Sequence, residues 1–265
     1  MLEGGYRSDD NLTRVETIYD NFDEDMRLKS NVGKLEFITT IKYIEDHLKK
    51  GDKILDLGAG TGAYSLYFAN RGYDVVAVEL LEKHSQQISE KYSDDNLEVI
   101  TDDALKFIKN LPDNSMDIVL CFGPIYHLIK REDRMEMLRE CRRVVKEDGK
   151  VFISIINHDN VIIVETFCYS GVKMLDRNDL PNTNFRIENI PFIFHTLDEF
   201  EEMLEESNLK LEKQIAQNGI AETVSEKLNE FSDEHFRKWL DFHLHICEKP
   251  EFQGVSSHNL FICSK

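Results

Sequence analysis

Residues 53–63, KILDLGAGTGA, decide the fold. An apolar run with one acid, Asp56, leads directly into glycines at positions 58, 60 and 62, and the segment AYSLYFAN continues with helix-compatible residues. Glycine lacks a Cβ, so the backbone can turn sharply and a ligand can approach it, while the first turn of a helix offers unpaired N–H groups. The stretch therefore predicts a strand, a tight turn and a helix, with a cofactor site at the carboxyl end of the strand.

Apolar strands and helical segments alternate after this stretch. Helical spacing characterises 35–48, a polar segment after the second strand, and 131–145. The further strands are expected at 74–80, 97–105, 115–122, 149–156, 209–219 and 259–265. Continuous apolar strands separated by helices indicate an α/β fold whose parallel sheet is covered on both faces.

Three regions lie outside this alternation. Residues 1–34 are polar with scattered aromatics and are expected to form an N-terminal cap, followed by one domain at 35–265. Within that domain, a loop-rich insertion at about 157–195 and a helical insertion at about 220–252 are expected to form a substrate lid. Between them, Thr196 and Glu199 have the spacing of a capping box, which predicts a helix start.

The whole-chain composition narrows the class of protein. The chain has 265 residues and a formal charge of −18, and its acids are spread along it, so its field should repel phosphate backbones; nucleic acid is not the expected partner. Five dispersed cysteines without a CxxC pair suit reduced thiols. Without a signal peptide or an apolar run of roughly 18 residues, we expect a cytoplasmic protein that does not enter a membrane.

The glycine loop alone is compatible with two cofactors. Gly58-x-Gly60-x-x-Ala63, with Glu79 about twenty residues later, can be matched to a dinucleotide site. The additional glycine at 62 and the acid Asp56 distinguish this loop from a dinucleotide site. An acid in the first strand would favour an amine-bearing ligand and oppose a diphosphate.

Four elements in order resemble the class I S-adenosylmethionine-dependent methyltransferases. They are DLGAGTG at 56–62, the acid Glu79 at the end of the second strand, an acid in TDDALKF at 101–107, and DIVLCFGPIYHL at 117–128. The resemblance covers about 35–156 well. It implies a Rossmann-like, doubly wound seven-stranded sheet, mostly parallel with an antiparallel last strand.

The resemblance also implies roles for individual residues. The backbone of Gly58, Ala59 and Gly60 would lie against the methionine part of S-adenosylmethionine, and Asp56 would orient its ammonium. Glu79 would accept from both ribose hydroxyls. The other implied cofactor contacts are Leu80 on the adenine ring, Asp103 and the N–H of Ala104 on the adenine edge, and Cys121 and Phe122 at the methionine end.

Some of these residues have a structural alternative. Asp103 also suits the N-cap of the following helix, and Asp102 is the alternative for the adenine contact. Tyr19, with Tyr6 and Phe22, either closes over the cofactor or packs on the sheet edge.

His127 and Tyr126 follow the fourth strand and are the candidate catalytic residues. A histidine can take a proton from the acceptor as the methyl group arrives, but methyl transfer depends mainly on alignment and exclusion of water, so a packing or hydrogen-bonding role is equally compatible. His243, His245 and Cys247 do not make a metal site, because only two of the three share a helix face and four ligands are lacking.

The sequence therefore predicts methyl transfer to an O, N or C atom of a small-molecule acceptor, with S-adenosylhomocysteine as product, by a monomer or homodimer. Two alternatives remain open. One is an NAD(P)-dependent oxidoreductase that uses the same glycines, and the other is a non-catalytic cofactor-binding module that recognises a protein partner through an exposed apolar surface on the insertions.

Overall fold

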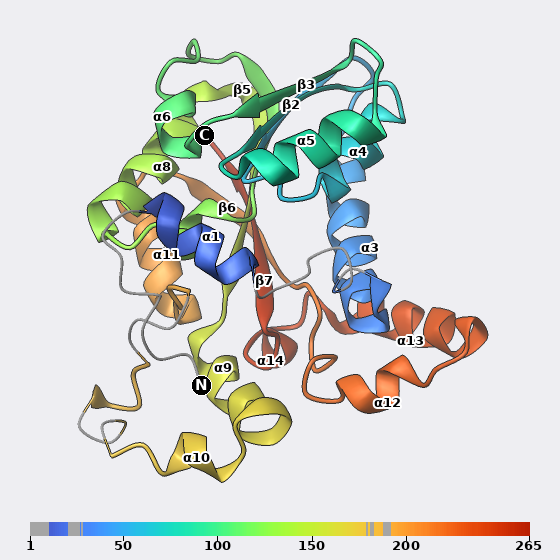
Figure 1. Ribbon diagram of the computed structural model, residues 1–265, viewed down its shortest axis with the longest axis vertical. Helices are drawn as coiled ribbons and strands as arrows, with labels where there is room; N and C mark the ends of the chain where they lie inside the picture. Colours follow the sequence, from blue (N-terminus) through green and yellow to red (C-terminus); the bar gives the residue numbers. More distant parts are fainter. Residues whose placement is uncertain (1–10, 21–26, 28, 179, 181–182, 188–191) are drawn as a thin grey trace.

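A seven-stranded sheet forms the centre of the protein in the computed structural model (Figure 1), which describes residues 11–20, 27, 29–178, 180, 183–187 and 192–265. The strands are β1 (Lys53–Leu57), β2 (Asp74–Glu79), β3 (Leu97–Thr101), β4 (Met116–Cys121), β5 (Val145–Ile156), β6 (Lys210–Ala216) and β7 (His258–Ser264). All seven expected strands are present.

The strand order is β3-β2-β1-β4-β5-β7-β6. Strands β1 to β5 pair in parallel, whereas β7 runs antiparallel to both β5 and β6. The predicted doubly wound, mostly parallel sheet with an antiparallel last strand is therefore confirmed. The carboxyl ends of β1, β4, β5 and β6 and the amino end of β7 meet at one edge of the sheet, where this kind of fold binds ligands.

Helices cover both faces of the sheet (Figure 1). On one face, α6 (Ala104–Ile108), α8 (Arg131–Val144) and α11 (Leu197–Glu206) contribute to the larger hydrophobic core, and on the other face α3 (Asn31–Glu45) and α4 (Ala63–Ala69) contribute to the second. The remaining helices of the main body are α1 (Asn11–Tyr19), α5 (Glu82–Lys91) and α7 (Pro124–His127). Burial on both faces explains why the strands are apolar without alternation.

Helix α3 begins four residues before the start predicted from its apolar spacing. Ser30 is its N-cap, and the Ser30 side chain accepts a hydrogen bond from the Gly33 N–H at 3.0 Å. The cap satisfies an N–H that has no partner within the helix. The predicted capping box at α11 is confirmed, with reciprocal bonds between Thr196 and Glu199.

The first insertion is helical where the sequence suggests a loop-rich segment. It contains α9 (His158–Val164), the π-helical turn η1 (Glu165–Tyr169) and α10 (Val172–Leu175), and the expectation of loops is wrong for this part. The pieces are short and largely exposed, so they lack the long apolar stripe by which a helix is recognised in a sequence. The second insertion contains α12 (Ser225–Asn229), α13 (Asp233–Ile246) and α14 (Pro250–Gln253).

The first insertion exposes large apolar side chains. Phe167 and Val172 each expose more than two thirds of their surface, and Ile163, Tyr169 and Leu175 are also exposed. Of the helices in the described ranges, none combines the length and apolar character needed to cross a membrane.

Candidate active site

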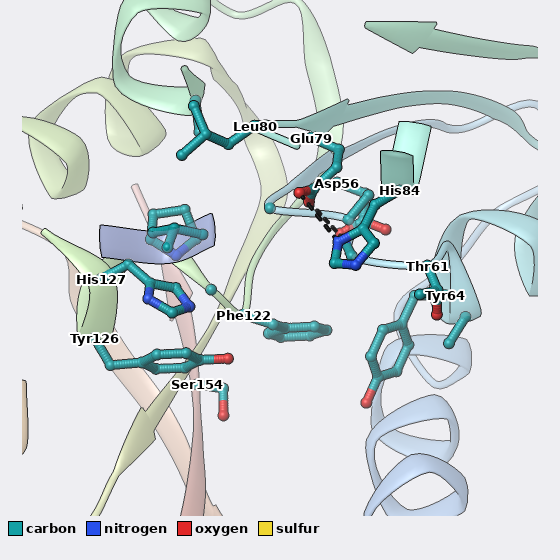
Figure 2. A pocket seen from close by; sticks show the side chains of 18 of the residues that line it. Asp56, Thr61, Tyr64, Glu79, Leu80, His84, Phe122, Tyr126, His127 and Ser154 are labelled. Carbon is teal, nitrogen blue, oxygen red and sulfur yellow. Dashed lines mark hydrogen bonds and ion pairs between the residues drawn. The ribbon is translucent and has the colours of Figure 1, made fainter. Parts of the chain in front are cut away.

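One cavity opens at the carboxyl edge of the sheet (Figure 2). Its walls come from the glycine loop, the ends of β2 and β4, and residues of α1, α3 and α7. Glu79, Leu80 and Asp56 lie toward one end, and Tyr126, His127 and Ser154 toward the other.

The glycine loop forms one wall of the cavity with its backbone. Gly58, Gly60 and Gly62 have φ angles of +74°, +56° and +88°, which residues with a Cβ rarely adopt. A Cβ on Gly62 would lie 2.7 Å from Cγ1 of Ile88, so this glycine is also needed for packing of α4 against α5, whereas nothing lies within 4 Å of a Cβ on Gly60. The backbone N–H groups of Gly58 and Ala59 both donate to the Val78 carbonyl, at 2.8 and 3.0 Å, which ties the loop to β2.

Glu79 links the end of β2 to the glycine loop. Its Oε2 accepts from the Gly60 N–H at 2.8 Å, and its Oε1 accepts from the Leu81 N–H at 2.9 Å. His84 Nδ1 lies 3.5 Å from Oε1. The carboxylate is thus held at the cavity wall in one orientation, with lone pairs left for a ribose diol.

Asp56 is a buried carboxylate at the end of β1. Only 1% of its surface is exposed, and its Oδ2 accepts from Ser65 Oγ at 2.5 Å. Burial raises the pKa of Asp56 to about 6, an effect that the Ser65 hydrogen bond opposes and the nearby Glu79 increases. No ion pair to Asp56 is found within the described part of the chain. An ammonium such as that of S-adenosylmethionine would supply the missing positive charge, so the site fits this cofactor.

Asp103 combines the two roles weighed for it. It lines the cavity, next to Ala104, and it is the N-cap of α6, where its Oδ1 accepts from the Lys106 N–H at 3.0 Å. Asp102 does not line the cavity; its Oδ1 accepts from the Asp103 N–H and from Lys106 Nζ. The position of Asp103 therefore favours it over Asp102 for an adenine contact.

The structure places His127 in the cavity wall as a poor base. It is buried, and burial, with a smaller effect of Arg14, lowers the pKa of its imidazole to about 3. Its Nε2 lies 3.2 Å from Tyr19 Oη, and its backbone carbonyl accepts from Arg14. A base is most effective when its pKa is near the working pH, so this environment favours the hydrogen-bonding alternative for His127.

Aromatic rings complete this end of the cavity. Tyr126 and Phe122 line it, and the Tyr64 and Phe122 ring centroids are 4.9 Å apart. Tyr19 also lines the cavity and packs edge-on against His84 at 5.4 Å. Tyr6 and Phe22, the aromatic residues that the sequence groups with Tyr19, lie outside the described residues.

Cys121 is not brought to the cavity. Its side chain is fully buried in the larger core cluster, while its neighbour Phe122 lines the cavity. Successive side chains of a strand point to opposite faces, so only one of two neighbours can face the ligand. Among the described residues, no group of three His, Cys, Asp or Glu side chains is placed to hold a metal.

A polar cluster at the cavity was not recognised in the sequence. Its members come from distant segments and line the cavity together: Arg27, Glu36, Ser154, Gln217 and His258. No local motif marks them. The only signal in the sequence is polarity at the ends of otherwise apolar segments, as for Ser154 in FISII and His258 before NLFIC.

Comparison with known proteins agrees with this geometry. Residues 55–153 match the family model described as a methyltransferase domain. A ubiquinone biosynthesis O-methyltransferase of Coxiella burnetii is 30% identical over 129 residues, covering 45% of this chain and 50% of the relative. A glycine/sarcosine N-methyltransferase of Aphanothece halophytica is 30% identical over 127 residues, covering 46% of each. The chain spans about half the length of these curated relatives.

Solved structures share the fold over most of the chain. A methyltransferase of Archaeoglobus fulgidus, described as SAM-dependent, has a TM-score of 0.59 at 18% identity and covers 93% of this chain and 99% of its own. The sheet order and the solved structures show the fold that this chain shares with SAM-dependent methyltransferases, and the family match shows a methyltransferase domain at residues 55–153.

Proposed function

We propose that the protein transfers a methyl group from S-adenosylmethionine to an O, N or C atom of a small-molecule acceptor. The observation that carries this proposal is the buried Asp56 carboxylate beside the glycine loop, because it leaves a negative charge that a bound ammonium would balance. When bound, the cofactor supplies an electrophilic methyl group. Glu79 and Asp103 would hold its adenosine part, with Leu80 and Ala104 beside the adenine.

The protein's own contribution to catalysis would be alignment and exclusion of water. Phe122 and Tyr126 supply apolar ring surface beside the polar cluster, so an acceptor is held against the methyl group in a largely dry space. The names of the relatives point to different acceptors, in ubiquinone biosynthesis in one case and glycine or sarcosine in the other, so they do not select one for this chain.

Thermal shift with S-adenosylhomocysteine and with NAD separates the two enzyme hypotheses. Stabilisation by S-adenosylhomocysteine alone supports methyl transfer, since a ligand that binds only the native state raises its stability. Stabilisation by NAD alone refutes it and supports the oxidoreductase. Radiolabelled methyl transfer to catechol, glycine and sarcosine then tests catalysis.

The non-catalytic alternative has one observation in its favour, the exposed Phe167, Tyr169 and Val172 of the first insertion. Exposed apolar patches mark interaction surfaces. This alternative predicts binding of S-adenosylhomocysteine without methylation of any small molecule, and an assay with a broad metabolite extract and labelled methyl donor distinguishes it from the enzyme.

A further inference from the structure

The polar cluster at the cavity contains a histidine paired with a carboxylate. His258 Nδ1 lies 3.4 Å from Glu36 Oε2. Glu36 is only 5% exposed, and Arg27 binds it through both guanidinium N–H groups, at 2.9 and 3.2 Å. Burial opposes ionisation, but Arg27 and His258 together hold the pKa of Glu36 below its ordinary value. The cavity thus contains an ionised glutamate directed at one nitrogen of an imidazole.

A hydrogen-bond network fixes Glu36 and His258 relative to the sheet. Ser154 Oγ donates to Gln217 Oε1 at 2.6 Å, Gln217 Nε2 donates to Thr40 Oγ1 at 2.8 Å, and Thr40 Oγ1 donates to the Glu36 carbonyl at 2.8 Å. His258 opens β7, where its carbonyl accepts from the Gln217 N–H at 3.0 Å. Hydrogen bonds therefore connect helix α3 to the ends of β5 and β6, at the point where His258 begins β7. The network holds Glu36 and His258 in place before any ligand binds.

His258 reaches the same cavity as the cofactor-side residues. Figure 2 shows Ser154 beside Tyr126 and Phe122 in the cavity wall, and His258 lines the same cavity. The carboxylate lies at Nδ1, and within the described residues no partner is found for Nε2 of His258. In this arrangement Nδ1 carries the hydrogen and Nε2 presents a lone pair.

We propose that His258 is the proton acceptor in the methyl transfer and that Glu36 is its positioning residue. This role rests on the proposed function. It defines the acceptor class as a small molecule whose nucleophilic oxygen or nitrogen bears both a lone pair and a proton, that is, a hydroxyl or a neutral amino group.

The step balances as follows. A lone pair on the acceptor O or N forms the bond to the methyl carbon while the carbon–sulfur bond of the donor breaks, and that electron pair remains on sulfur. The acceptor proton moves to Nε2 of His258. The resulting imidazolium is stabilised by the Glu36 carboxylate and later releases its proton to water.

One neighbour competes for Nδ1 of His258. Asn218 Nδ2 also lies 3.4 Å from His258 Nδ1. The orientation of the Asn218 amide is fixed, because its Oδ1 accepts from Ser256 Oγ and from the Ser257 N–H. An amide donor would favour the opposite tautomer. The interaction with an ionised carboxylate is stronger than that with a neutral amide, so the Nδ1–H form prevails. The ionisable groups found against His258 are Glu36 and, through it, Arg27.

Nitrogen NMR of the imidazoles tests the arrangement without any substrate. In protein labelled with 15N-histidine, the resonances that disappear in His258→Gln belong to His258, and His245→Gln, on the exposed face of α13, is the matched control. The wild type should show the Nδ1–H tautomer at neutral pH, and Glu36→Gln should shift it toward Nε2–H. A wild-type Nε2–H tautomer would overturn the proposal.

Kinetics test the catalytic role with whichever of catechol, glycine or sarcosine the wild type methylates. We expect His258→Gln to lower kcat about 100-fold or more, with unchanged S-adenosylhomocysteine affinity and melting temperature, and to abolish the fall of kcat at acidic pH. His258→Gln with wild-type kcat and pH profile overturns the role of His258 and leaves the proposed function standing. A wild type that methylates no small molecule in a broad metabolite extract with labelled methyl donor refutes the function itself, while the tautomer is still measured.

Discussion

Replacing Asp56 by asparagine should stabilise the protein against unfolding at pH 8 while weakening its affinity for S-adenosylhomocysteine. The pKa of Asp56 is about 6 in the folded protein against 3.8 for a free side chain. A difference of about two pKa units, at 1.36 kcal/mol each, corresponds to a cost of ~3 kcal/mol for keeping the carboxylate ionised in the fold. Asparagine removes this cost.

The net gain is smaller because the new amide needs a partner. The side-chain oxygen of the introduced asparagine can still accept from Ser65 Oγ, but an unsatisfied NH₂ group costs about 1–2 kcal/mol, which leaves a stabilisation of roughly 1–2 kcal/mol, or about 2–8 °C in Tm. The loss of the partner for a bound ammonium should weaken S-adenosylhomocysteine binding by about 1.5–3 kcal/mol, roughly tenfold to a hundredfold.

The sign of the pH dependence checks the cause. The folded-state pKa is raised, so the cost is full above about pH 6, falls as the pH drops toward 3.8, and is absent below 3.8. Urea unfolding of wild type and Asp56→Asn should therefore give a stability difference of roughly 1–2 kcal/mol at pH 8 that falls by about 1.5 kcal/mol, to near zero, at pH 5. Asp95→Asn, at an exposed site, is the control and should change neither quantity. Equal or lower stability of Asp56→Asn at pH 8, with unchanged ligand affinity, would refute the reasoning.

Three further outcomes follow from the same structure. Asp103→Ser keeps a side-chain oxygen that can cap α6, but the shorter side chain no longer reaches the adenine. Isothermal titration should therefore show about tenfold weaker S-adenosylhomocysteine binding for Asp103→Ser, whereas Asp102→Ser should bind as the wild type does. Gly60→Ala should lower ligand affinity at a stability cost of about 1 kcal/mol, whereas Gly62→Ala should cost about 2–3 kcal/mol in urea unfolding; equal costs would contradict the packing argument. Burial lowers the pKa of His195 to about 3, so the stability contributed by the neutral His195 side chain is present above about pH 6.5 and lost on acidification. In urea unfolding, His195→Asn should reduce the stability loss between pH 7 and pH 5 by up to about 2 kcal/mol. An unchanged loss would show that His195 is protonated in the fold.

The sequence predicts the sheet, and it predicts that Asp56, the glycines and Glu79 meet at one edge of it, because both depend on local order. Asp56, the glycines and Glu79 are separated by short, regular distances, and strands β1 and β2 carry them to one edge whatever surrounds them. Asp103 could also be placed, since an acid that caps a helix after a strand lies at the same edge.

Other features depend on packing that a sequence does not display. Cys121 and Phe122 are neighbours on a strand that is buried on both faces, so composition cannot say which side chain meets the ligand. The weak basicity of His127 comes from its enclosure beside Arg14, and Gln217 meets Thr40 across 177 residues of chain. Such contacts arise only once the sheet has formed.

The polar cluster is built entirely from residues outside the matched domain. Glu36 precedes residues 55–153, and Ser154, Gln217 and His258 follow them. On the proposed function, the two halves of the sheet would diverge separately. Substitutions at the carboxyl ends of β5 and β6 and the amino end of β7 would change the acceptor, while β1 and β2 would hold the same methyl donor. In this architecture, descendants that share a donor site need have no substrate in common.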